Sequence, residues 1–231
     1  MTPPPQPDPN RRLVQFWDQP APPPEVAALM AEWQAAFAGG YRRFDHASAT
    51  DYLAGRFPAR IRAAFACCAV PAMQADFFRY CVLYAEGGLY VDADTRPIGD
   101  LAALAGRAAR AMLMDRRGRT ANDVMFFRHP QDPLLSRVID IATANIEAAR
   151  SNNVWQVTGP GIMTALRADP AEAHLFVGID ILPVMEVGQA VRFVWTMDYK
   201  DGAEDWRRAD SIFRDRPPEL SHDPLTTPKP D

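Results

Sequence analysis

The chain has 231 residues, and its 25 basic and 29 acidic residues give it a net charge of −4. This length suits one domain and excludes a large multidomain enzyme, and the missing basic excess argues against a nucleic acid partner. No apolar run reaches the roughly 18 residues of a membrane span, and the start MTPPPQPDPNRR lacks the apolar core of a signal peptide. Cys67, Cys68 and Cys81 form no disulfide framework. We therefore expect a cytoplasmic protein without a transmembrane segment.

Proline is concentrated at the two ends of the chain. Nine of the 22 prolines fall in the first 24 residues and five in the last fifteen. Pro-rich segments of this kind are extended and poorly ordered. The sequence therefore predicts a Pro-rich tail over 1–11, a single folded domain over 12–216 and a second tail over 217–231.

The first half of the folded region alternates between strand and helix patterns. We expect strands over 12–17 and 41–45, and helices over 24–37, 48–57 and 59–68. Pro24 suits the first turn of a helix, and Gly39-Gly40 suits its end. The clearest helix covers 72–86, where Met73, Phe77 and Tyr84 recur on one face, and Gly87-Gly88 ends it before a strand over 89–91.

The second half continues the alternation. We expect strands over 111–114, 124–127, 175–184 and 191–195, and helices over 133–149 and 161–166. Strands that alternate with helices are typical of a doubly wound, mostly parallel α/β sheet.

An acidic turn directly follows the strand over 89–91. Ligands of open α/β sheets bind beyond the carboxyl ends of the strands, and Asp92 and Asp94 stand two residues apart at such an end. Their carboxylates can converge on Mg²⁺ or Mn²⁺, which also accept water and phosphate oxygens as ligands. An ordinary polar turn with two aspartates is the alternative, because the motif is short.

The residues before this turn carry a much longer pattern. Asp76-Phe77-Phe78-Arg79-Tyr80 and then Leu83-Tyr84-Ala85-Glu86-Gly87-Gly88-Leu89-Tyr90-Val91-Asp92-Ala93-Asp94 resemble glycosyltransferase family 32, which includes α-mannosyltransferase-like and capsular polysaccharide proteins and is distantly similar to bacterial glucosylating toxins. The resemblance implies a GT-A-like α/β fold, a doubly wound mixed sheet flanked by helices in a single domain. It also implies transfer with retention of anomeric configuration.

Weaker matches extend the resemblance from about residue 13 to 166. The opening strand ends at Trp17, as the family's first strand ends in a tryptophan that stacks on the nucleobase. Core packing is the alternative for this side chain. Asn122-Asp123-Val124-Met125 and Thr158-Gly159-Pro160 also follow in the family's order.

The resemblance assigns roles to further residues. Asp76 and Arg79 would hydrogen-bond the hydroxyls of the donor sugar; an exposed ion pair within the helix is the alternative. Tyr90 either lies beside the base or packs in the core. Asn122 and Asp123 are expected at the start of a strand. Asn122 would line the sugar or acceptor side. Asp123 would lie near the reacting carbon or serve as a turn or capping residue.

Two further assignments concern the region after residue 150. The turn around Gly159 would present backbone N–H groups at a helix start, to an anion or an acceptor, or be an ordinary helix start. Family members often carry a His-Trp pair near the C-terminal end; here Asp205-Trp206 stands in its place, so Asp205 is the candidate third metal ligand beside Asp92 and Asp94.

The resulting hypothesis is a glycosyltransferase that needs Mn²⁺ or Mg²⁺. Its partners would be a UDP- or GDP-sugar donor and a saccharide or other hydroxyl acceptor in polysaccharide or glycoconjugate synthesis, with a peripheral membrane or protein partner also open. The catalytic candidates are Asp92, Asp94 and Asp123. The alternatives are a sugar-nucleotide or glycan-binding module of the same fold and an aspartate phosphatase, which lacks support because Arg96 stands where such enzymes need threonine or valine.

Overall fold

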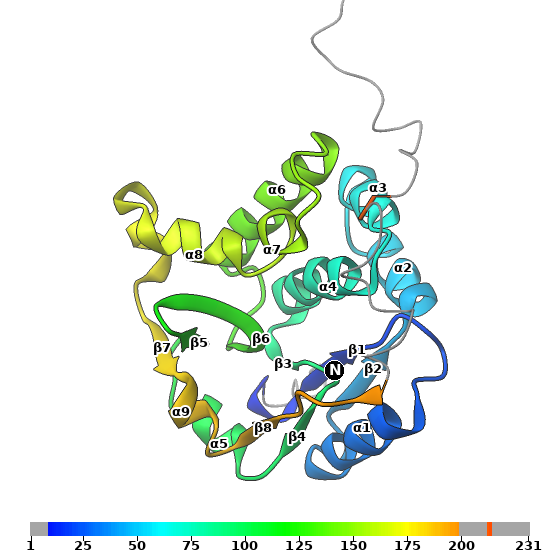
Figure 1. The fold of residues 1–231 in the computed structure, drawn as a ribbon. Coiled ribbons are helices and arrows are strands. Elements are labelled where there is room, and N and C mark those ends of the chain that lie inside the picture. The colour runs from blue at the N-terminus through cyan, green and yellow to red at the C-terminus, as the bar shows by residue number, and fades with distance from the viewer. Residues whose placement is uncertain (1–8, 199–211, 214–231) are drawn as a thin grey trace, which may run out of the picture.

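The computed structural model describes residues 9–198 and 212–213, and Figure 1 gives its course. In this part of the chain six strands form one sheet in the order β2-β1-β3-β6-β5-β7, and β4 and β8 form a second, two-stranded sheet. The strands are β1 (Leu13–Phe16), β2 (Tyr41–Phe44), β3 (Gly88–Val91), β4 (Thr95–Pro97), β5 (Ala111–Arg116), β6 (Arg119–Phe127), β7 (Ile179–Pro183) and β8 (Val191–Phe193).

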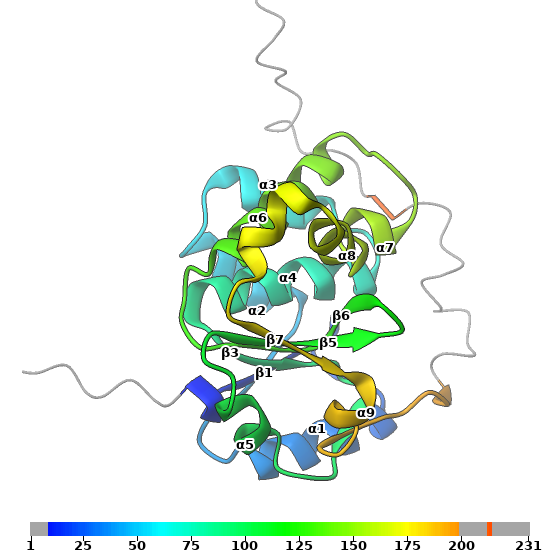
Figure 2. The ribbon, with the colours of Figure 1, turned by 90° about the vertical axis from the view of Figure 1, so that its left-hand side faces the viewer.

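Helices cover both faces of the large sheet. The α-helices are α1 (Pro24–Ala36), α2 (His46–Ala54), α3 (Ala59–Cys67), α4 (Pro71–Glu86), α5 (Leu101–Gly106), α6 (Pro133–Glu147), α7 (Val154–Val157), α8 (Gly161–Ala168) and α9 (Val184–Val187). Two short 3-10 helices, η1 (Pro9–Arg11) and η2 (Pro170–Phe176), complete the elements. Figure 2 shows the sheet edge-on, with α4, α6 and α8 on one side and α1, α5 and α9 on the other.

The two layers follow from the alternation of side chains along buried strands. Tyr90, between Leu89 and Val91 on β3, joins the apolar cluster under α4 and α6, whereas its two neighbours join the cluster under α1 and α5. Phe126 and Phe127 divide in the same way on β6. The predicted α/β class with helices on both faces is therefore confirmed.

Strand directions refine the expected topology. β1 pairs in parallel with β2 and β3, and β5 with β7, but β6 runs antiparallel to both β3 and β5. Five of the six strands therefore run in the same direction and β6 opposes them, so the sheet is mixed, as the resemblance implied, and also mostly parallel, as the alternation of strands and helices predicted. The hairpin β5–β6 turns at Arg117 and Gly118, both with positive φ, and this reversal brings the start of β6 to the carboxyl end of β3.

Gly87 shows why the glycine pair after α4 is required. Its φ of +67° lies in the left-handed region, and a Cβ atom there would stand 2.8 Å from the carbonyl oxygen of Phe127. Glycine therefore lets the chain turn sharply from α4 into β3, directly against β6.

One expected strand was partly wrong. Residues 170–176 form the 3-10 helix η2, and the strand β7 is limited to Ile179–Pro183. The reason is local: the Asp169 side chain accepts a hydrogen bond from the Ala171 backbone N–H, and Pro170 suits a first helical position. Gly178, with a φ of +75°, then separates helix from strand.

Candidate active site

Hydrogen bonds to backbone carbonyl oxygens hold the acidic turn at the carboxyl end of β3. The carbonyl oxygen of Asp92 accepts hydrogen bonds from Gln15 Nε2 at 3.2 Å and from Thr95 Oγ1 at 2.6 Å. The Trp33 indole on α1 donates to Thr95 in turn, at 3.0 Å to its carbonyl oxygen. The Val194 N–H after β8 donates to the Asp94 carbonyl at 2.9 Å. The acidic turn is therefore rigidly attached to three elements.

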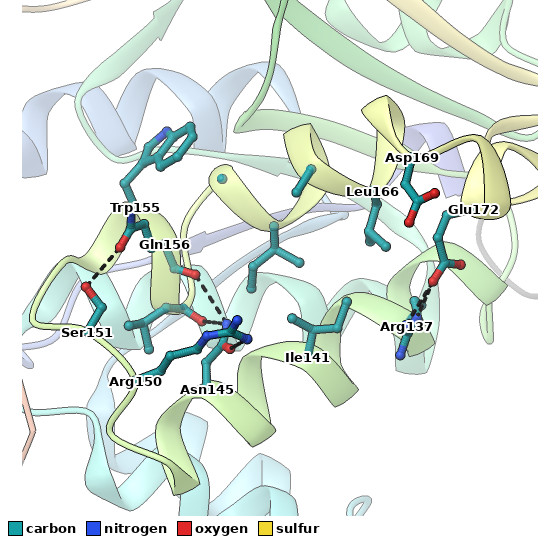
Figure 3. Close-up of a pocket in the computed structure, with 14 residues that line it drawn as sticks. Arg137, Ile141, Asn145, Arg150, Ser151, Trp155, Gln156, Leu166, Asp169 and Glu172 are labelled. Carbon is teal, nitrogen blue, oxygen red and sulfur yellow. Dashed lines mark hydrogen bonds and ion pairs between the residues drawn. The ribbon is translucent and has the colours of Figure 1, made fainter.

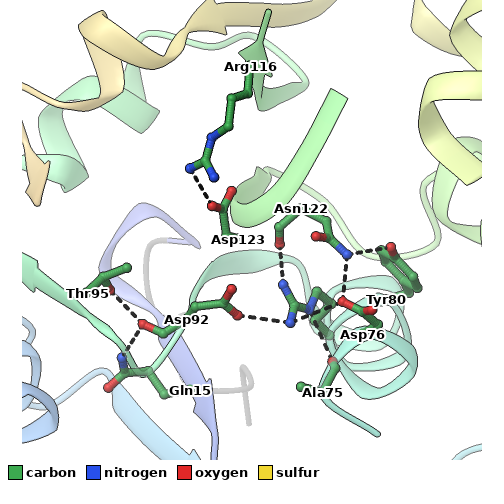
Figure 4. Close-up of polar contacts among 10 residues, drawn as sticks. Gln15, Ala75, Asp76, Tyr80, Asp92, Thr95, Arg116, Asn122 and Asp123 are labelled. Atoms are coloured by element: carbon green, nitrogen blue, oxygen red, sulfur yellow. Dashed lines mark hydrogen bonds and ion pairs between the residues drawn. The ribbon is translucent and has the colours of Figure 1, made fainter. Parts of the chain in front are cut away.

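Asp76 and Arg79 lie beneath this turn and are buried, with 7% and 4% of their surfaces exposed. The alternative of an exposed helical ion pair is therefore wrong. Arg79 Nη2 lies 2.9 Å from Asp92 Oδ1 and 3.3 Å from Asp76 Oδ1, and its Nη1 donates to the Asn122 carbonyl oxygen at 2.6 Å. One guanidinium thus links α4, the acidic turn and β6. Figure 4 shows how its partners Asp76, Asp92 and Asn122 converge from these three elements.

Tyr90 packs in the core, one of its two predicted environments, and also lines a pocket. Its ring is fully buried in the core, and the Arg79 guanidinium carbon lies 4.4 Å from the ring centroid. A cation over an aromatic face is attracted by the ring's negative centre. Tyr90 therefore supports Arg79 from below and also contributes to the pocket wall described below.

The Asn122 side chain on β6 binds the Asp76 carboxylate. Its Nδ2 donates to Asp76 Oδ1 at 2.8 Å and to the Tyr80 hydroxyl at 2.7 Å. Asn122 and Asp123 were expected at the start of a strand, but they lie inside β6, because the strand begins at Arg119. The amide of Asn122 orients the Asp76 carboxylate.

Asp123 lies beside Asp92 because β6 is antiparallel to β3: the Asp92 N–H donates to the Asp123 carbonyl oxygen at 2.9 Å. Asp123 Oδ2 accepts from Arg116 Nη2 at 2.7 Å, whereas its buried Oδ1 accepts no hydrogen bond from the described residues. Arg116 was missing from the sequence prediction. It stands on β5, seven residues before Asp123, and no local motif connects the two.

These side chains form an acidic cluster, Asp76, Asp92, Asp94 and Asp123, opposed by Arg79 and Arg116. Burial raises the pKa of Asp92 to about 8, against the lowering effect of Arg79 and with the help of the neighbouring carboxylates. Burial also raises the pKa values of Asp76 and Asp123. A protonated carboxyl or a bound cation would relieve this excess of negative charge.

A divalent cation fits the chemistry of this cluster. Asp92 and Asp94 offer carboxylate oxygens on one rigid turn, and Asp123 Oδ1 is a buried oxygen without a donor among the described residues. Within 9–198 and 212–213, however, no group of three His, Cys, Asp or Glu side chains is arranged as a metal site. Asp205, the predicted third ligand, and Trp206 lie outside the described residues.

A pocket of about 660 Å³ opens above Asp92 and Arg79. It lies between the carboxyl ends of β1 and β3 and the first turn of α4, and its lining comprises Phe16, Trp17, Asp18, Gln19, Pro23, Pro71, Ala72, Ala75, Asp76, Arg79, Tyr90, Asp92, Ala93, Asp94, Val154, Trp155 and Pro160. Trp17 is half-buried, so it packs against the core and still faces the pocket. The structure thus gathers most of the predicted residues around one cavity.

Gly159 has a packing role in this structure. A Cβ atom there would lie 2.7 Å from the Trp155 Cα, and Gly159 is not part of the pocket lining, whereas Pro160 and Trp155 are. Trp155 is a second residue that the sequence prediction missed. It stands in the four-residue helix α7, too short for helical periodicity to reveal.

An acidic turn at the strand ends, a buried carboxylate–arginine pair and an adjoining pocket thus lie together at the edge of the sheet where open α/β sheets bind their ligands. Residues 7–111 match the family described as a glycosyltransferase sugar-binding region containing a DXD motif. This part of the chain is therefore similar to the sugar-binding region of DXD glycosyltransferases, which agrees with the resemblance and the transferase class predicted from the sequence.

Two individual proteins are similar to the chain. An initiation-specific alpha-1,6-mannosyltransferase of Schizosaccharomyces pombe is 51% identical over 39 residues, which are 17% of this chain and 10% of the yeast protein. The solved PaToxG glycosyltransferase has a TM-score of 0.48 at 14% identity, over 72% of this chain and 71% of that chain. No helix among the described residues is long and apolar enough to span a membrane.

Proposed function

We propose that the chain is a metal-dependent, retaining glycosyltransferase that moves a sugar from a UDP- or GDP-sugar to a saccharide or other hydroxyl acceptor. The observation that carries this proposal is the placement of the Asp92–Asp94 turn beside a pocket that holds Asp76 and Arg79 on one side and Trp17 on the other. This arrangement offers separate groups to a diphosphate, a sugar and a base.

The buried pair would bind the sugar. Asp76 accepts and Arg79 donates hydrogen bonds, so the pair matches the hydroxyl groups of a hexose, each of which can do both. Asn122 and Tyr90 hold the two side chains in orientation from β6 and β3. The half-buried indole of Trp17 offers an aromatic face to the nucleobase.

Asp92 and Asp94 would hold Mn²⁺ or Mg²⁺, with Asp205 as the third candidate ligand. Such an ion, when bound, neutralises charge on a departing nucleoside diphosphate. Arg79 would then be released from its ion pair with Asp92 and become available to the sugar. Asp123, whose Oδ1 accepts no hydrogen bond from the described residues, lies on the same side of the cluster and would face the reacting carbon.

The yeast relative suggests which donor to test first. That protein is named a mannosyltransferase, so we propose a mannose donor, GDP-mannose, ahead of the UDP-sugars. The resemblance to polysaccharide-building members supports a role in polysaccharide or glycoconjugate synthesis in the cytoplasm.

The first experiment measures donor binding and hydrolysis. A panel of UDP- and GDP-sugars is added with Mn²⁺ to the full chain, and melting temperature and release of nucleoside diphosphate are recorded. We expect one donor to raise the melting temperature and to be hydrolysed slowly, and Asp92→Asn to reduce that hydrolysis by about 100-fold or more, since mutations of groups that stabilise developing charge typically have such effects.

The matched control is Asp51→Asn, which changes an exposed aspartate on α2 and should behave like the parent chain. If no donor shifts the melting temperature in the presence of Mn²⁺, the proposal is wrong. Binding without any turnover would favour the alternative of a nucleotide-sugar-binding module.

A further inference from the structure

A second pocket of about 550 Å³ lies on the helical layer next to the first (Figure 3). Arg137, Ile141 and Asn145 line it from one face of α6, because they are spaced four residues apart. The opposite wall comes from α7 and α8, and η2 adds Glu172 at one end. None of the described residues that were given a role toward the donor lines this cavity.

Trp155 joins the two cavities, because it contributes to the lining of both. Its indole is tightly seated: a Cβ atom at Gly161 would lie 2.6 Å from the ring atom Cε3. Glycine at 161 therefore allows the ring to lie against the first turn of α8. With 39% of its surface exposed, Trp155 is one of the few large apolar residues that remain open to solvent.

The charged side chains in the lining of this pocket balance one another. Arg137 and Arg150 bring two positive charges, and Asp169 and Glu172 bring two negative charges. Arg137 is paired with Glu172 at 2.8 Å, whereas Arg150 forms no ion pair with any described residue and reaches only Asn145 Oδ1, at 3.5 Å. The lining as a whole therefore carries no net charge, and its side chains include both donors and acceptors of hydrogen bonds, as the hydroxyl groups of a neutral saccharide require.

We propose that this second pocket binds a neutral saccharide as the acceptor, with Trp155 between acceptor and donor. An exposed indole offers a flat apolar face to the C–H groups of a pyranose ring, and planar amide and guanidinium groups bind its hydroxyls in pairs. The Gln156 amide and the Arg150 guanidinium are such groups. The acceptor role rests on the proposed transferase function; the saccharide site itself does not.

Saturation-transfer NMR tests this directly with α-1,6-mannobiose and cellobiose as neutral probes and glucuronate as an anionic one. The full chain is used both alone and with GDP and Mn²⁺. We expect transfer to at least one neutral disaccharide and none to glucuronate.

Ala165→Trp should then reduce binding by about tenfold or more, because residue 165 is an exposed lining position on α8 where a large ring would fill the cavity. Ala103→Trp, at an exposed position of α5 on the other side of the sheet, is the matched control and should bind like the parent chain.

The outcomes separate the two proposals. No transfer to either disaccharide under any condition, or equal transfer with Ala165→Trp and the parent chain, would overturn the saccharide site. Disaccharide binding that is lost only in Ala165→Trp supports it. If such binding persists while no nucleotide sugar shifts the melting temperature, the saccharide site stands and the transferase function fails.

Discussion

The two pockets share Trp155 but differ in how their charges are held. In the donor pocket, Asp76 and Arg79 are almost fully buried and are bound by groups from β3 and β6. In the second pocket, Arg137 and Glu172 pair on the helical surface, and the arginine side chain is 48% exposed. The first arrangement is fixed by the whole sheet, whereas the second needs only two neighbouring helices. Rigid burial suits a group that must meet a reacting sugar, and an open surface suits an exchangeable acceptor.

The largest effect is expected from Arg79→Met, which keeps the bulk of the side chain and removes its charge. Asp76 and Asp92 would lose their shared cation, and breaking a buried pair in this way costs about 3–5 kcal/mol. Urea unfolding at pH 7.5 measures this loss, with Arg62→Ala on the exposed face of α3 as the control. A loss below about 1 kcal/mol, as surface pairs give, would remove the contrast between the pockets.

A smaller effect is expected from pH in the metal-free chain. The pKa of Asp92 is about 8 in the folded state because of burial, above its ordinary value of 3.8. Between these values the folded state binds more protons than the unfolded state, so the free energy of unfolding should fall as pH rises. Melting curves from pH 5 to 8 test this. Asp92→Asn should make the dependence less steep, because the amide cannot ionise; an unchanged slope would contradict the raised pKa.

The smallest effect is expected in the second pocket. Arg137→Ala removes an ion pair that is largely exposed to water, and such pairs contribute about 0–1 kcal/mol to stability. Urea unfolding should therefore give nearly the parent value, and the little that is lost should disappear in 1 M salt, where charges are screened beyond about 3 Å. A loss comparable to that of Arg79→Met would mean that the second pocket is as tightly constrained as the first.

Much of the donor site could be predicted because its signals are local. The apolar face of α4, the glycine pair that ends it and the aspartates after β3 lie in one continuous segment, and helix ends and strand ends are set by neighbouring residues. The placement of Asp92 at a strand end and of Trp17 at the end of β1 needed only the parallel pairing of these strands.

Other features required the tertiary structure. The reach of Asn122 to Asp76 and the contact of Arg79 with Asn122 depend on β6 running antiparallel to β3. The pairing of Arg116 with Asp123 depends on the antiparallel pairing of β5 with β6. Periodicity identifies a strand without its direction or its neighbour, since hydrogen bonds between strands form over long separations in sequence.

By itself the sequence determined the α/β class, most helices and strands, the position of the DXD turn and the resemblance to DXD glycosyltransferases. Only the tertiary structure decided that Arg79 is a buried link between three elements and that Trp155 separates two pockets. The physical reason is the distance along the sequence between the residues that interact. Caps, turns and helical faces act over a few residues, whereas a pocket exists only after distant elements have packed against the same sheet.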